Sequence, residues 1–228
     1  MGIKQKTNTF RHRPIFSLRK KKRRILRRAI DWWGHRRLEQ SGVTPFIDEF
    51  HATQPGHAIP PCYRDLWFLY KSVRTRRPKV VWEFGSGIST VVLTKALFDN
   101  GEGHLYSMDA EAQWAAVTTA AIPSRIAQFC TVMHSPADEV NYKGRLAFQH
   151  RVVPEVMPNF AYLDGPPLTP QRNIAIDLML IEDELPADFF LVIDGRKENT
   201  SFLQQNFERR YVFKQREVSY QPVFELIA

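Results

Sequence analysis

The sequence lacks the features that mark several classes of protein. Cysteine occurs only at Cys62 and Cys130 in 228 residues, and that separation fits neither a disulfide framework nor a zinc site. No apolar run approaches the ~20 residues that span a bilayer. No apolar segment with a small-residue cleavage site marks a secretory signal. These absences predict a globular protein of a reducing, cytoplasmic compartment.

Acidic side chains are almost missing from residues 1–37, which hold 14 Lys or Arg and the single acid Asp31. The whole chain has 32 basic and 24 acidic residues, so 18 basic and 23 acidic residues remain for positions 38–228. The net charge is therefore about +13 in the first segment and about −5 in the rest. The high overall charge is no evidence that the globular part itself binds nucleic acid.

Residues 1–37 are interpreted as a basic N-terminal extension. The first fifteen residues show no apolar periodicity and are expected to be disordered. From Phe16 to Arg37, apolar residues recur at helical spacing among Lys and Arg, which predicts a basic amphipathic helix. These apolar residues are Leu18, Ile25, Leu26, Ala29, Ile30 and Trp33.

With Trp32 and Trp33, this helix has the pattern of an interfacial anchor, so the leading hypothesis is peripheral binding to an anionic membrane surface. Nucleic-acid binding is the rival hypothesis, because the same charges would neutralise phosphates. A solubilising extension without a partner is the third interpretation.

The rest of the chain is long enough for one domain. Residues 38–78 are predicted to form a connector, rich in Gly and Pro between Ser41 and Pro61, and a helix at Tyr63–Val73. Residues 79–228 alternate strand-like and helix-like segments, which predicts an α/β fold with a mostly parallel sheet between two helical layers. The expected strands are Lys79–Phe84, Leu105–Met108, Thr131–His134, Phe160–Leu163, Phe189–Ile193, Tyr211–Lys214 and Val223–Ile227. The expected helices include Glu111–Ala121 and Gln171–Glu184. The last two strands have only a short link, so they should be antiparallel.

A ligand-binding turn is predicted where Gly85 and Gly87 follow the first strand of this domain, with Ser89 or Thr90 able to cap the next helix. A tight turn alone would also require glycine, so the GxG spacing by itself leaves both interpretations open. Glu83, at the end of the strand, would repel a pyrophosphate and attract a cationic cofactor.

Asp109 ends the next strand about twenty residues after the glycines, where a carboxylate can accept hydrogen bonds from both hydroxyls of a ribose. The sequence EFGSGIS at residues 83–89 resembles motif I of class I S-adenosylmethionine-dependent methyltransferases, and Asp109 matches the acid of their second strand. The resemblance covers residues from about Tyr63 to Ala228. It implies a three-layer, Rossmann-like sandwich that ends in an antiparallel strand pair.

The resemblance also implies a set of contacts with S-adenosylmethionine. It places Glu83 near the methionine amino group and Asp109 on the ribose. It places the turn under the cofactor and the residues after the third strand near the adenine. The turn residues are Gly85, Ser86, Gly87 and Ser89, and the residues after the third strand are Ser135, Pro136 and Ala137.

Asp164 is the first candidate for the catalytic base or substrate-orienting residue, because it lies at the carboxyl end of the fourth strand of the expected sheet. An Asp-Gly-Pro turn capped by Asp164 is the structural alternative. Asp194 ends the fifth strand and is a candidate substrate-binding residue, and Arg196 and Arg172 are candidates for binding an acidic substrate. A lone Arg is more often a solvated surface charge, which is the alternative for both arginines. Histidines such as His134 and His150 are more often structural or exposed than catalytic. A catalytic role stays open for His150, because it precedes the strand that carries Asp164.

Asp164 and Asp194 end neighbouring strands and could hold a divalent cation, an arrangement that resembles catechol-type O-methyltransferases. Those enzymes follow the later Asp with Asn, whereas this chain has Gly195, so a divalent metal is an open but disfavoured alternative. Stacking of a flipped base is also poorly supported, because Gly165 separates Asp164 from Pro166-Pro167 and Leu168 replaces an aromatic residue.

The sequence therefore predicts methylation of an oxygen, or less favourably a nitrogen, in a small molecule or glycan precursor. The alternatives are a Rossmann-like binding module without catalysis, a nucleic-acid methyltransferase that uses the basic extension, and an NAD-dependent oxidoreductase.

Overall fold

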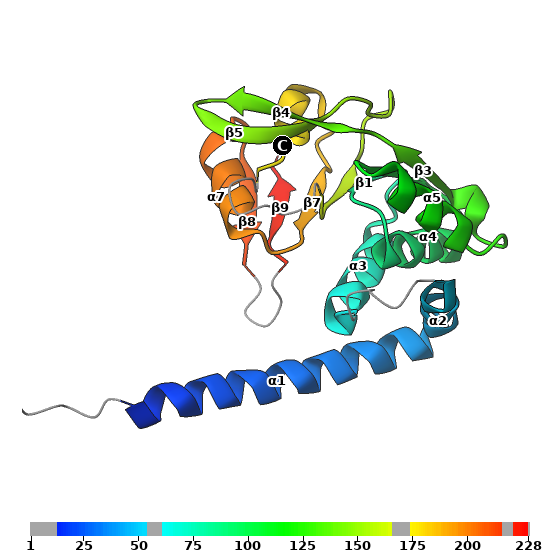
Figure 1. Cartoon of the computed structure of the whole chain (residues 1–228), viewed down its shortest axis with the longest axis vertical. Helices are drawn as coiled ribbons and strands as arrows, with labels where there is room; N and C mark the ends of the chain where they lie inside the picture. Colours follow the sequence, from blue (N-terminus) through cyan, green and yellow to red (C-terminus); the bar gives the residue numbers. More distant parts are fainter. Residues whose placement is uncertain (1–12, 54–60, 166–173, 216–220, 228) are drawn as a thin grey trace, which may run out of the picture.

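The computed structural model describes residues 13–53, 61–165, 174–215 and 221–227. Figure 1 shows a mixed α/β body with one long N-terminal helix along its side. The helices are α1 Arg13–Gln40, α2 Thr44–Thr53, α3 Tyr63–Arg76, α4 Ile88–Asn100, α5 Ala112–Ala121, α6 Asp177–Leu180 and α7 Lys197–Asn206, with 3-10 turns η1 Ala127–Phe129 and η2 Glu182–Glu184. None of the helices in these ranges is both long enough and apolar enough to cross a bilayer.

The main sheet has seven strands in the order β3-β2-β1-β6-β7-β9-β8. Its first five strands are parallel, while β9 is antiparallel to both β7 and β8. The strands are β1 Val80–Phe84, β2 His104–Asp109, β3 Cys130–His134, β6 Phe160–Leu163, β7 Phe190–Ile193, β8 Tyr211–Lys214 and β9 Val223–Leu226. The expected mostly parallel sheet with an antiparallel C-terminal pair is confirmed.

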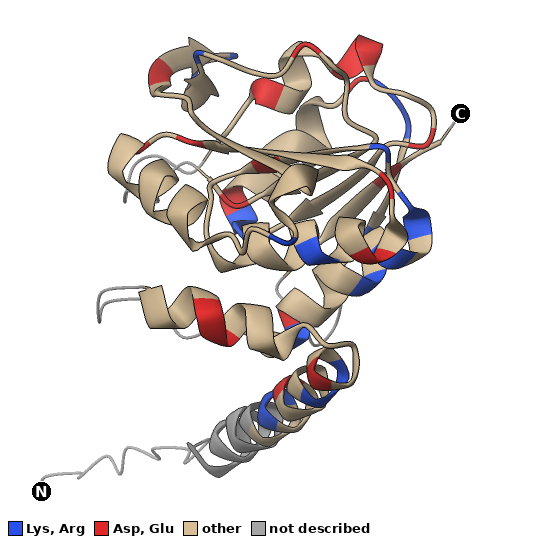
Figure 2. Ribbon diagram, turned by 90° about the vertical axis from the view of Figure 1, so that its right-hand side faces the viewer, with Lys and Arg blue, Asp and Glu red and all other residues tan. Residues whose placement is uncertain are grey.

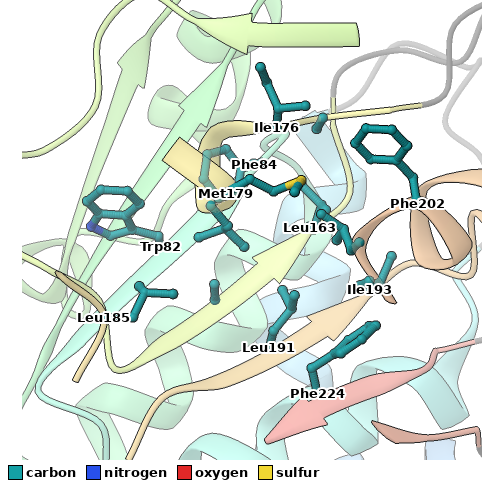
Figure 3. Close-up of a cluster of buried hydrophobic side chains, with 14 of the residues drawn as sticks. Trp82, Phe84, Leu163, Ile176, Met179, Leu185, Leu191, Ile193, Phe202 and Phe224 are labelled. Carbon is teal, nitrogen blue, oxygen red and sulfur yellow. The ribbon is translucent and has the colours of Figure 1, made fainter. Parts of the chain in front are cut away.

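Side chains alternate between the two faces of this sheet, as the period of two in β-strands requires. In β1, Trp82 and Phe84 face one core, while Val81 faces the other. The first core lies under α6, α7 and the loop before α6, and Figure 3 shows Trp82 and Phe84 in it beside Leu163 and Phe202. The second core lies under α3 and α4. The chain therefore forms the expected three layers.

Local sequence explains where the helices around the second core begin and end. The Gly87 N–H donates to Thr90 Oγ1 at 2.8 Å, which satisfies a free donor at the start of α4. Gly101 ends α4 with a φ of 70°, a conformation that glycine adopts without strain. Helix α3 ends at Arg77, which takes a φ of 49° and donates its N–H to the Val73 carbonyl.

Four segments differ from the sequence-based expectations. Residues 44–53 of the expected connector form α2, whose Phe46 and Phe50 pack against α4 and α5. The hairpin of β4 Ala137–Tyr142 and β5 Arg145–His150 was not predicted, and neither was α7. The helix expected at Gln171–Glu184 is wrong in extent: α6 is short, and the residues before it pair with β5 through a parallel bridge between Ala175 and Phe148 instead. Residues 171–173 of that prediction lie outside the described residues.

Helix α1 confirms the expected N-terminal helix but is longer. It begins at Arg13, so the expectation of disorder is wrong for residues 13–15, and the expectation for residues 1–12 falls outside the described residues. It also continues through residue 37 to Gln40, past the predicted end of the extension. The helix continues because Leu38 is buried against the α3 and α4 core, which stabilises the last turn. The division into 1–37, 38–78 and 79–228 stays a prediction.

Candidate functional site

The carboxyl ends of four adjacent parallel strands bring the predicted site residues to one edge of the sheet. In the register, Phe84 of β1 lies between Met108 of β2 and Leu163 of β6, and Leu163 lies beside Ile193 of β7. The residue after each of these strand positions is a predicted site residue: Gly85, Asp109, Asp164 and Asp194. This is the edge at which open α/β sheets hold ligands.

The fold requires glycine at only one of the two glycine positions in the turn after β1. Gly85 has a φ of +91°, and a Cβ there would lie 3.0 Å from the Asp164 carbonyl oxygen, so both the turn and its packing require glycine. Gly87 is buried, yet a Cβ there would have only the Trp114 Nε1 within 4 Å, at 3.9 Å. Packing within the chain explains Gly85 but leaves space beside Gly87.

Asp109 is held firmly beside this turn and is 5% exposed. Its Oδ2 accepts from the backbone N–H of Ser86 at 2.8 Å and from the Ser86 hydroxyl at 2.7 Å, while its Oδ1 accepts from the Glu111 N–H at 2.9 Å. Trp114 donates from Nε1 to the Ser86 carbonyl at 2.5 Å and so ties α5 to the turn. Sequence reasoning did not single out Trp114, because nothing local places its side chain over the turn.

Glu83 lies deeper than the sequence indicated. Its side chain is fully buried between β1, β2 and α4, and its Oε2 accepts from the hydroxyls of Thr90 and Ser107, each at 2.6 Å. Burial raises the pKa of Glu83 to about 7, against hydrogen bonds from Ser107, Ser89 and Thr90 that lower it. Because a carboxyl with a pKa of about 7 is only partly ionised near neutral pH, Glu83 repels a phosphate less than an ordinary glutamate would, so the choice of cofactor depends on the acids nearer the edge. A contact between Glu83 and the methionine amino group stays a prediction.

Ser89 and Ser135 are also buried. The Ser135 hydroxyl donates to the Val152 carbonyl at 2.7 Å and accepts from the Val152 N–H at 3.0 Å, and the Ser135 N–H donates to the Asp109 carbonyl at 2.8 Å. Ser135 therefore joins the end of β3 to the chain that leaves β5. A cofactor contact by either serine stays a prediction.

Asp164 and Asp194 lie together at the ends of β6 and β7, bridged by Arg196. Arg196 donates from Nε to Asp194 Oδ2 at 2.7 Å and from one terminal nitrogen to the Asp164 carbonyl at 2.5 Å, with the Asp164 Oδ1 at 3.7 Å. The Tyr162 hydroxyl donates to Asp164 Oδ2 at 3.2 Å. The Arg196 side chain is 7% exposed and engaged by both acids, so its first role is to position them. Binding of substrate by Arg196 or Asp194 stays a prediction.

Burial and the adjacent Asp194 carboxylate raise the pKa of Asp164 well above its usual range, and Arg196 opposes that rise. Because 41% of the Asp164 side chain is exposed to solvent, burial contributes less to this raised pKa than the charge of Asp194 does. The alternative of a simple capped turn does not account for two acids held side by side. Asp164 is therefore a carboxyl that is both accessible and a stronger base than an ordinary aspartate.

His150 forms a buried pair with Asp177, which the sequence did not indicate because the two residues are far apart in the chain. Asp177 Oδ1 accepts from the His150 N–H at 2.7 Å, and its Oδ2 lies 3.2 Å from the His150 Nδ1. The ring of His150 lies 5.4 Å from that of Phe84 at the end of β1, and its Nε2 has no hydrogen-bond partner in the described structure. His150 thus lies beneath the carboxyl edge rather than on the surface.

Two of the predictions about ligands remain open. Arg172 lies outside the described residues, so its role as a substrate-binding residue stays a prediction. Within the described ranges there is no group of three or more His, Cys, Asp or Glu side chains arranged to hold a metal ion. The expectation that a divalent metal is disfavoured also stays a prediction.

No protein-family model matches the sequence, and no curated protein matches it. Solved structures do match the fold. A methyltransferase from Podospora anserina bound to S-adenosylhomocysteine has a TM-score of 0.57 at 11% identity, over 80% of this chain and 88% of that one. A putative O-methyltransferase from Klebsiella pneumoniae gives 0.53 at 13%, over 81% and 89%. An O-methyltransferase from Bacillus cereus in complex with S-adenosylhomocysteine gives 0.51 at 13%, over 81% and 91%. The chain is thus similar in fold to these enzymes.

Proposed function

We propose that this chain, which has the Rossmann-like fold of class I methyltransferases, is itself an S-adenosylmethionine-dependent methyltransferase. The observation that carries the proposal is the space beside Gly87, where the fold does not require a glycine but a closely approaching ligand would. Gly87 is the N-cap of α4, and Asp109 lies against the same turn through Ser86. The glycine and the acid are thus arranged around one binding position.

The hydrogen-bonding capacity of Asp109 supports a ribose at this position. A carboxylate offers about four acceptor sites. Three are occupied within the chain, and one of the three is the Ser86 hydroxyl, which can rotate away. Two sites can therefore serve the two hydroxyls of a ribose without loss of the backbone hydrogen bonds that hold the turn.

The acids of the carboxyl edge favour a cationic cofactor over a dinucleotide. Asp109, Asp164 and Asp194 all lie at this edge, and Arg196 is engaged by two of them. A pyrophosphate would be repelled by the acids that Arg196 compensates only in part, whereas an ammonium or sulfonium group would be attracted. An NAD-dependent oxidoreductase is therefore the weaker alternative.

Asp164 supplies the chemistry that transfer to oxygen requires. S-adenosylmethionine, when bound, offers a methyl group activated by its positively charged sulfur. Asp164 would accept the proton of the acceptor hydroxyl and so prepare the oxygen to receive the methyl group that the bound cofactor would supply. The raised pKa of Asp164 strengthens it as a base, and Tyr162 and Arg196 hold it in place.

For the acceptor we propose a hydroxyl group of a small molecule or glycan precursor, with nitrogen as the less favoured atom. A cavity of about 450 Å³ between α7 and β8 supports an acceptor of this size, because it opens beside Gly195 directly after Asp194. A nucleic-acid acceptor receives less support, because the described part of the carboxyl edge carries Asp109 and places Asp164 and Asp194 around Arg196, an arrangement that does not favour phosphates.

Calorimetry with S-adenosylhomocysteine tests the cofactor. We expect heat of binding with the wild-type chain, strong weakening by Asp109→Ala, and no binding of NADH in a parallel titration. Absence of heat in the wild type would remove the central proposal, and NADH binding at the same site would favour the oxidoreductase.

Methyl transfer from radiolabelled S-adenosylmethionine to a panel of hydroxyl and amine acceptors tests catalysis. We expect Asp164→Asn to retain cofactor binding and lose transfer. Unchanged transfer in this variant would exclude Asp164 as the base. Cofactor binding without transfer to any acceptor would favour a binding module.

A further inference from the structure

Helix α1 presents an apolar stripe to solvent. Ile25, Leu26, Trp32 and Trp33 are 58%, 49%, 66% and 47% exposed. At 100° per residue these positions fall on one side of the helix, with the exposed Ala29 between them. We name Ile25, Leu26, Ala29, Trp32 and Trp33 the outward stripe. The usual amphipathic arrangement would turn such residues toward the core.

The opposite side of α1 is fixed to the body of the protein, so the stripe cannot turn inward. A Cβ on Gly34 would lie 2.7 Å from the backbone of Arg64, which shows how closely α1 approaches the start of α3. Asp31 Oδ1 accepts from the Arg64 N–H at 3.2 Å, at the positive end of the α3 dipole. Leu38 is fully buried below this contact. The rotation of α1 is therefore set by α3, and it directs the stripe outward, although the half-exposed Trp33 also contacts Trp67 of α3 edge-on with 6.1 Å between the ring centres.

Cations flank the stripe. Arg28, Arg36 and Arg37 are exposed along it, and the guanidinium groups of Arg36 and Arg37 lie 5.9 and 5.7 Å from the ring centres of Trp32 and Trp33. Arg36 also forms an ion pair with the exposed Glu39 at 3.0 Å, and Figure 2 shows basic and acidic residues side by side on the described part of the helix. The sequence before it adds further Lys and Arg, with 14 basic residues and one acid in residues 1–37.

We propose that α1 lies in the headgroup layer of an anionic lipid bilayer, with the outward stripe inserted and the cations against the lipid phosphates. Exposed tryptophans beside arginines combine apolar insertion with attraction to anionic headgroups, which is the pattern of interfacial helices. A nucleic acid would engage the cations and stack bases on the tryptophans, but it would leave the aliphatic Ile25 and Leu26 in water. A second copy of the chain would bring two segments of about +13 charge together.

This placement brings the lipid surface to the end of the molecule that holds the candidate site. The C-terminal parts of α3 and α4 lie together, since Tyr70 donates to Asp99 at 2.7 Å and Asn100 donates to the Val73 carbonyl at 3.1 Å. Their N-terminal ends therefore lie toward the carboxyl edge of the sheet, where α4 begins at Gly87, and α1 crosses α3 at that end. An acceptor held at the membrane would reach the site there, a consequence that rests on the proposed function.

Sedimentation of the full chain with phosphatidylcholine vesicles, with and without phosphatidylglycerol, tests the proposal. We expect binding that needs the anionic lipid and weakens by about tenfold or more in Ile25→Ser/Trp32→Ser, because the inserted area sets the strength of binding. The matched control is Leu180→Ser/Val156→Ser, which removes two apolar side chains of 46% and 44% exposure on other elements. It should bind vesicles like the wild type.

Three outcomes would overturn the proposal: no sedimentation of the wild type with anionic vesicles, equal binding by the stripe variant and the wild type, or equal loss in both double variants. Parallel measurements with single-stranded RNA and by analytical ultracentrifugation identify the other occupants. A selective loss of RNA binding, or of a dimer, in the stripe variant without vesicle binding would assign the stripe to that partner instead. S-adenosylhomocysteine binding, measured in every variant, reports separately on the proposed enzyme.

Discussion

Replacing Glu83 by glutamine should change how the stability of the protein depends on pH. The folded chain raises the pKa of Glu83 from 4.5 to about 7, because burial disfavours the charged form. A rise of that size corresponds to about 3 kcal/mol, at about 1.4 kcal/mol for each pH unit. Glutamine keeps the carbonyl that accepts from Thr90 and Ser107, but it cannot ionise.

The sign follows from proton binding. Between pH 4.5 and about 7 the folded chain holds a proton on Glu83 that the unfolded chain has released, so the wild type loses stability as the pH rises through this window. The free energy of unfolding of Glu83→Gln, relative to that of the wild type, should therefore be about 3 kcal/mol higher at pH 8 than at pH 4.5. In a protein of this size, that difference corresponds to roughly 6–12 °C in Tm.

Urea unfolding of both proteins across this pH range measures the difference directly. The new hydrogen-bond geometry of glutamine shifts the free energy of unfolding by the same amount at low and at high pH. The informative quantity is therefore how the stability difference between the two proteins varies with pH. A stability difference that is the same at pH 5 and pH 8 would refute the assignment of Glu83 as a buried acid with a raised pKa.

Three further predictions concern the glycines and the acid of the candidate site and the packing of α1. Gly87→Ala should leave Tm unchanged and weaken S-adenosylhomocysteine binding. Gly85→Ala should lower the free energy of unfolding by about 1–3 kcal/mol, because of its positive φ and its contact with the loop after β6. Equal changes of Tm in the two variants would contradict this distinction. If Asp164 is the base, the acidic limb of the kcat/KM profile should lie above the usual range of aspartate, and Asp194→Asn should move it to lower pH by removing the neighbouring charge; an unmoved limb would assign it to another group. Gly34→Ala should lower the free energy of unfolding by about 1–3 kcal/mol, as denaturant titration would measure, because the added methyl group meets the α3 backbone; no loss would show that α1 does not pack this closely.

Much of the fold was predictable because its signals are local. The alternation of Trp82 and Phe84 with Val81 indicates a strand buried on both faces, and the following glycines indicate the turn into α4. The hairpin of β4 and β5 was missed although it has a signal of its own. Its turn is Lys143-Gly144, with φ values of 49° and 76°, and lysine is a rare residue for that conformation.

The candidate site divides in the same way. The placement of Asp109, Asp164 and Asp194 at strand ends follows from the order of strands and needs no contact information. The hydrogen-bond and ion-pair partners of the site side chains do not follow from the strand order. That Arg196 joins two of the acids, and that His150 pairs with Asp177, depends on segments that meet only when the sheet and its covering layers assemble.

Residue type and spacing are enough to predict the strand-turn-helix with its glycines, the acids at the strand ends and the basic character of the N-terminal helix. Three other features depend on the folded chain: Gly85 is required by the turn while Gly87 leaves space, Glu83 lies beneath α4, and Trp32 of α1 is exposed to solvent. Burial, charge proximity and the direction of a helix face arise from contacts between distant segments. No local pattern encodes them.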